Sequence, residues 1–100
     1  MISEDTKKIL ERAGVSYSDI FTLEKSAEDA LKRAVKCDPS AIKTLRTVTL
    51  FYRKISDKLD SARKKGIISL IEWNKAGSEI YRVMDKTEDK IIENLEVCMR

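Results

Sequence analysis

The two cysteines of this chain are the residues whose side chains could form a covalent bond with each other. Cys37 and Cys98 are the only cysteines among 100 residues. The chain has no His, which removes the commonest acid–base group and metal ligand. It also contains no CxxC pair, Gly-rich phosphate loop, HExxH or GxSxG motif. The favoured interpretation is two small buried thiols, and the alternative is one disulfide.

The places of the two cysteines in the expected helices leave both alternatives open. Cys37 ends an expected second helix and Cys98 ends the last one. If the last two helices fold back on each other, both cysteines lie at the same end of the molecule. A disulfide there would close a loop of about sixty residues and add about 4 kcal/mol in the chain-entropy model. Against it, disulfides are rare in the cytosol outside hyperthermophiles.

Carboxylates are abundant, at 17 Asp and Glu, but their spacing indicates ordinary surface charge. Pairs such as Glu4–Lys8 and Glu79–Arg82 stand three or four residues apart, as in helix-stabilising ion pairs. The usual metal pattern of helical bundles places His three residues after Glu, which this chain cannot do. We expect no enzymatic activity, no cofactor, no metal and no small-molecule substrate. An enzyme built on the surface carboxylates is the least favoured alternative.

Basic residues are concentrated in the middle of the chain, although the net charge is only +3. Residues 38–66 carry eight basic and three acidic side chains, whereas residues 1–37 carry seven of each. The default interpretation is a solvated helix face with cations suited to a helix C-terminus. The alternative is a strip that contacts phosphates. Its candidate residues are Lys43, Arg46, Arg53, Lys54, Arg63, Lys64 and Lys65.

Three aromatic residues, Tyr52, Trp73 and Tyr81, are the candidates for a partner interface. Trp and Tyr are enriched at the residues that dominate binding energy in protein interfaces. Burial within one protomer explains Trp73 and Tyr81 equally well, because both lie on or beside an apolar stripe. For Tyr52, which fits the helical seam, a core position is the favoured interpretation.

The stretch from Asp38 to Gly66 predicts the element that must position these residues. Asp38 can cap a helix, Pro39 suits its first turn, and Gly66 can end it in the left-handed conformation. Between these signals the apolar residues alternate at spacings of four and three, which indicates a helical seam over 39–65. The seam consists of Ala41, Leu45, Val48, Tyr52, Ile55, Leu59 and Ala62.

Three further helices are expected, over about 3–13, about 19–37 and 70–98. Ser3 can cap the first helix and Gly14 can end it, while Ser69 and Glu72 have capping-box spacing before the last. A second cap signal at Ser26 predicts a bend near residue 25. No strand alternation appears anywhere.

We therefore predict a single all-α domain, a small antiparallel helical bundle built on a long C-terminal helical hairpin. At 1.5 Å per residue the hairpin helices span roughly 40–45 Å and the preceding helix roughly 28 Å. The shorter helices cannot cover the whole hairpin, so we expect part of it to be buried by a second copy or another protein.

These features predict a non-enzymatic protein–protein interaction or assembly module that acts through helix faces and self-associates as a homo-oligomer. The runner-up is a small nucleic-acid-binding accessory protein that uses the basic central helix and the hairpin tip. We expect a cytoplasmic location without membrane contact, because the chain has no long apolar run and its N-terminus lacks the layout of a signal peptide.

Overall fold

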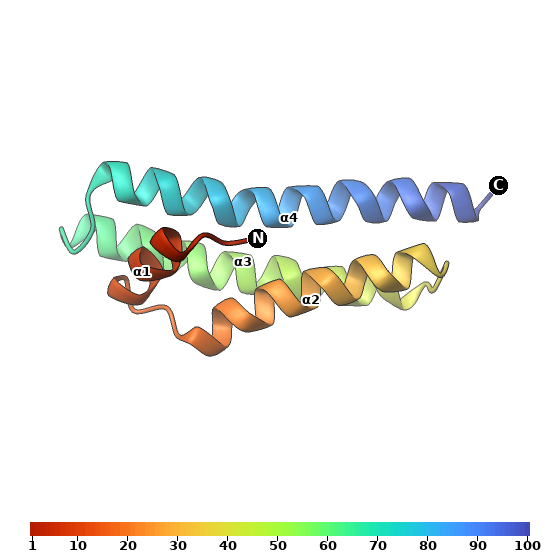
Figure 1. Ribbon diagram of the computed structural model, residues 1–100, viewed down its shortest axis with the longest axis horizontal. Coiled ribbons are helices and arrows are strands. Elements are labelled where there is room, and N and C mark those ends of the chain that lie inside the picture. The colour runs from red at the N-terminus through yellow and green to blue at the C-terminus, as the bar shows by residue number, and fades with distance from the viewer.

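The computed structural model describes residues 1–100 as four helices without strands, which confirms the all-α fold class. The helices are α1 (Glu4–Arg12), α2 (Tyr17–Val35), α3 (Ser40–Lys64) and α4 (Leu70–Cys98). They form an elongated bundle of 50 × 21 × 20 Å (Figure 1).

The antiparallel hairpin of α3 and α4 is the longest part of the bundle and runs along its whole length (Figure 1). In α3 the expected seam faces the interior: five of its seven residues are buried, and Leu45 and Tyr52 are half-buried. In α4, Ile80 and Ile91 are buried. Helix α2 packs against both members of the hairpin, which makes the scaffold a three-helix bundle.

Helix α1 adds a fourth layer over only half of this scaffold. It lies between α2 and α4 near the α3–α4 turn, and the N-terminus ends about midway along the bundle (Figure 1). Its apolar residues Ile9 and Leu10 are buried. The half of the bundle that holds the α2–α3 turn is therefore built from three helices.

The hydrophobic core also consists of two parts, one in the half of the bundle that contains α1 and one in the three-helix half. The larger cluster lies where α1 is present and contains the large side chains Leu10, Leu23, Ile55 and Ile80. The smaller cluster contains only four buried residues, and three of them are alanines. Its members are Ala30, Ala34, Ala41 and Ile91. Small side chains bury little apolar area, so this end of the bundle has the weaker core.

Helix α2 differs most from its expected bounds. It begins at Tyr17 rather than near residue 19, because Ser16 supplies the N-cap: its hydroxyl accepts from the backbone N–H of Asp19 at 3.1 Å. It then continues through residue 25 without a break. Two large apolar residues of this helix, Phe21 and Val35, are exposed.

Asp38 caps the start of α3 from two residues ahead. Its Oδ1 accepts from the backbone N–H of Ser40 at 2.9 Å. This backbone hydrogen bond, with a further one from the Ser40 side chain, lowers the pKa of Asp38.

None of the four helices combines the length and apolar character that crossing a membrane requires.

Candidate functional site

An aromatic groove between α3 and α4 brings together all three aromatic residues that the sequence nominates. We define the aromatic groove by Tyr52, Trp73 and Tyr81, which line a hollow of about 260 Å³. Every residue that lines this groove comes from α3 or α4, so neither α1 nor α2 covers it. The three side chains thus form part of one surface of the hairpin.

Contacts within the groove hold its aromatic rings in place. The rings of Tyr52 and Tyr81 meet edge to face with centroids 6.1 Å apart. The indole Nε1–H of Trp73 donates to Asp60 at 2.8 Å, and the Arg63 guanidinium lies 4.8 Å from the ring centroid on the other helix. Rings that are held in one geometry lose little entropy when a partner packs against them.

Gly77 lies in the middle of α4 and lines the same groove. A Cβ added there would meet no atom within 4 Å. Nothing in the protomer therefore requires glycine, although glycine in a helix interior costs roughly 0.5–1 kcal/mol relative to alanine. A close approach by a second molecule would explain the glycine, because a backbone without a Cβ lets another molecule come nearest.

Exposed apolar side chains extend this surface along α4. Leu70, Tyr81, Ile92 and Met99 recur at spacings of eleven, eleven and seven residues, which keeps them on one helix face. All four are about half exposed or more. At 1.5 Å per residue, neighbours in this row stand about 10–16 Å apart, so the row adds single apolar contacts to the groove and not a contiguous patch.

The seven basic candidates do not form one strip. Lys54 faces α2, where it pairs with Asp19 at 3.3 Å. The Arg63 guanidinium lies over the ring of Trp73 in a cation–π contact. Arg46 and Arg53 flank the exposed Leu50 on the outer face of α3. Lys64 and Lys65 lie at the hairpin tip, where α3 ends, whereas Lys43 lies in the first turn of the same helix, at the opposite end of the bundle.

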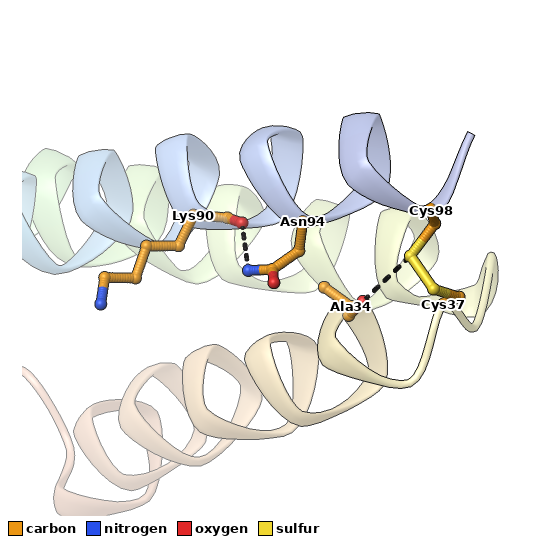
Figure 2. Close-up of a disulfide and its surroundings, with 5 residues drawn as sticks. All are labelled: Ala34, Cys37, Lys90, Asn94 and Cys98. Carbon is orange, nitrogen blue, oxygen red and sulfur yellow. Dashed lines mark hydrogen bonds between the residues drawn. A yellow bond between two sulfur atoms is a disulfide. The ribbon is translucent and has the colours of Figure 1, made fainter. Parts of the chain in front are cut away.

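Cys37 and Cys98 form a disulfide that ties the end of α4 to the α2–α3 turn (Figure 2). Their Cα atoms are 5.6 Å apart and 61 residues apart in the chain. The Cys98 Sγ also lies 3.9 Å from the Ala34 carbonyl oxygen. Because a disulfide sulfur carries no proton, this is a close contact rather than a donated hydrogen bond.

The backbone at Cys37 is unusual for a residue other than glycine. Its φ is +59°, and it follows α2 in a Schellman motif: its N–H donates to the Ala34 carbonyl and the Asp38 N–H donates to the Arg33 carbonyl. The ends of α1 and α3 show the same pattern with Gly14 and Gly66 at the equivalent position. Cysteine thus stands where this chain otherwise uses glycine.

Two carboxylates have roles that the sequence pattern does not show. Asp19 is buried and pairs with Lys54, which corrects the expectation that every carboxylate lies on an outer face. Glu79 is half-buried and accepts from the backbone N–H and hydroxyl of Ser3, at 2.9 and 3.0 Å, and from the Thr6 hydroxyl. Burial alone would raise the pKa of Glu79, but these hydrogen bonds outweigh it and lower the pKa.

The remaining titratable groups show no arrangement that would hold a cation. No three His, Cys, Asp or Glu side chains cluster closely enough to bind a metal ion.

Comparison of the chain with protein-family models, curated proteins and solved structures found no match.

Proposed function

We propose that this protein is a non-enzymatic interaction module that self-associates through the face of the hairpin that carries the aromatic groove. The observation that supports it most is the glycine at position 77. Gly77 leaves bare backbone between the rings of Trp73 and Tyr81, and the protomer itself places nothing there. A second copy packed on this face would bury the bare backbone, the rings and the apolar row of α4 together.

Light scattering after size-exclusion chromatography tests the proposal with two substitutions. Gly77→Ala should raise the free energy of unfolding of the protomer by about 0.5–1 kcal/mol and shift the oligomer toward monomer. Tyr81→Glu should also produce monomer, because it puts a charge into an apolar interface. Tyr17→Glu is the matched control, since Tyr17 is 73% exposed at the start of α2 and lies outside this face.

The wild-type oligomer should persist at high salt, because an apolar interface is screened very little. A wild-type protein that is monomeric at every concentration, or an oligomer that Tyr81→Glu and Gly77→Ala leave intact, would contradict the proposal.

Nucleic-acid binding is the second candidate, because six of the seven basic candidates form no ion pair within the protomer. Of these six, Arg63 lies over the Trp73 ring, and the other five are Lys43, Arg46, Arg53, Lys64 and Lys65. The same chromatography with a short single-stranded oligonucleotide separates the two functions. A monomer that gains mass with the oligonucleotide at low salt and loses it at high salt would favour this candidate.

A cytoplasmic location is part of the proposal. The disulfide restricts it, because intracellular proteins that keep structural disulfides belong mainly to hyperthermophiles. Mass spectrometry of alkylated, unreduced protein taken from its own cells would show whether both cysteines are bonded there.

A further inference from the structure

A second groove lies between α2 and α4, on a different side of α4 from the aromatic groove. It has a volume of about 360 Å³ and begins at Met1, just ahead of the N-terminus of α1. Its apolar floor comes from Ala27 and Leu31 of α2 and Val83 of α4. The α4 wall carries Arg82, Lys86 and Lys90, and we call this hollow the cationic groove.

The three cations stand at spacings of four residues, so they form one row along α4. None of them forms an ion pair. Glu79, the carboxylate that lines the groove, accepts hydrogen bonds from Ser3 and Thr6. Figure 2 shows the Lys90 side chain on the side of α4 that faces α2, beside Asn94. The groove thus combines an apolar floor with a wall of three cations that form no ion pair, and Glu79 is the single carboxylate of its lining.

Helix α1 shows what this channel between α2 and α4 accepts. In the other half of the bundle α1 lies between the same two helices with its apolar residues buried. Its charges match the walls: Lys7 pairs with Glu24 of α2 at 3.8 Å, and Asp5 pairs with Lys75 of α4 at 3.4 Å. The cationic groove is the continuation of that channel beyond Met1.

We infer that the cationic groove binds an acidic amphipathic helix of a partner protein, which would continue the layer that α1 begins. The apolar face of such a helix would cover Leu31 and Val83, and its carboxylates would pair with Lys86 and Lys90. Toward the disulfide, Val35 follows Leu31 by four residues on α2, and Val97 follows Lys90 by seven residues on α4. Both valines are exposed, at 68% and 61%. The three cations of the groove wall span about 12 Å of α4, and Val97 extends this side of the helix to about 22 Å, which accommodates about fifteen helical residues.

The test uses two synthetic peptides of about fifteen residues with the same leucine stripe. One carries Glu on its flanks and the other carries Lys. Fluorescence anisotropy of the labelled peptides measures affinity, and the methyl NMR signals of Leu31 and Val83 report whether the peptide lies in the groove. We expect the Glu peptide to bind and to shift these signals, and the Lys peptide to bind at least about tenfold more weakly.

Charge reversal at Lys86→Glu together with Lys90→Glu should exchange the two preferences, so that the variant takes the Lys peptide. Lys64→Glu together with Lys65→Glu makes the same change of net charge at the hairpin tip and should leave both affinities unchanged. The exchange of preference requires a folded variant, so loss of folding cannot imitate it.

Several outcomes would overturn the inference. These are equal binding of both peptides, binding of neither, or an equal effect of the tip variant. Groove signals that shift with decanoate but not with the Glu peptide would make the groove a site for small amphiphiles. A wild-type oligomer that the Lys86 and Lys90 variant dissociates and Tyr81→Glu does not would make the occupant a second copy. The proposed self-association depends on the other face, so it can fail or succeed independently.

Discussion

A single residue, Cys37, shows how one side chain can outweigh the preference of the backbone. A left-handed conformation costs a residue other than glycine roughly 1–2 kcal/mol. Gly14 and Gly66 avoid that cost at the other two Schellman motifs. Cys37 pays it because only a side chain can reach Cys98. We conclude that this position is occupied for the bond and not for the turn.

This conclusion predicts an ordering of two variants that both lack the disulfide. Cys37→Gly with Cys98→Ser should be more stable than Cys37→Ser with Cys98→Ser by about 1 kcal/mol, because only glycine relieves the left-handed backbone. Urea denaturation of both proteins under identical conditions measures the difference. Equal midpoints would mean that the left-handed conformation carries no cost once the bond is gone.

At the scale of the element, α1 depends on a carboxylate from another helix. Nine residues are too few for a helix to be stable alone. Glu79 of α4 accepts from Ser3 and Thr6 at the α1 N-terminus, where a negative charge also favours the helix dipole. The hydrogen bonds therefore both dock α1 and cap it.

The lowered pKa of Glu79 makes this docking dependent on pH. The stabilisation is fully present above the unfolded pKa of about 4.3 and is lost as the pH falls through the lower folded pKa. We expect Glu79→Gln to lower the free energy of unfolding by about 1–2 kcal/mol at pH 7, and by less below pH about 4.

Chemical denaturation of both proteins from pH 7 to pH 3 measures this convergence. Glu88→Gln is the control, since Glu88 is exposed and forms no ion pair, and it should change stability little at any pH. A constant difference between wild type and Glu79→Gln across this range would show that ionisation of Glu79 is not what holds α1.

At the scale of the whole molecule, one end of the bundle is held mainly by apolar packing and the other by the disulfide. The end that contains α1 has the large apolar core, whereas the other end has three small alanines, Ile91 and the disulfide. The bond closes the α3–α4 hairpin against the α2–α3 turn where packing is weakest (Figure 2). It therefore acts as the staple of the three-helix half.

Reduction should accordingly loosen one end first. We expect reduction, or Cys37→Ser with Cys98→Ser, to cost about 2–4 kcal/mol of stability. Amide hydrogen exchange should accelerate in the last turns of α2 and α4, while the amides near Leu23 and Ile55 remain the slowest. Exchange that accelerates uniformly along the chain would contradict this division.

Much of the architecture follows from local sequence signals alone. The caps at Ser3, Asp38 and Ser69, and the glycines at 14 and 66, place most helix ends within one or two residues. The seam of α3 identifies its buried face, because a helix with one apolar side has only one face to bury. The sequence also nominates Tyr52, Trp73 and Tyr81, since large aromatics on a polar chain are few.

Only the tertiary structure decides which of these residues meet. The same aromatic residues are consistent with burial or with a surface groove until α4 is set against α3. Glu79 and the row of Arg82, Lys86 and Lys90 look like ordinary surface charge in the sequence, and their neighbours on α1 and α2 lie more than fifty residues away. Helical periodicity is a local property, so it determines which face of a helix is apolar. What lies opposite that face depends on how far α1 reaches along the bundle, and that is a property of the packed molecule.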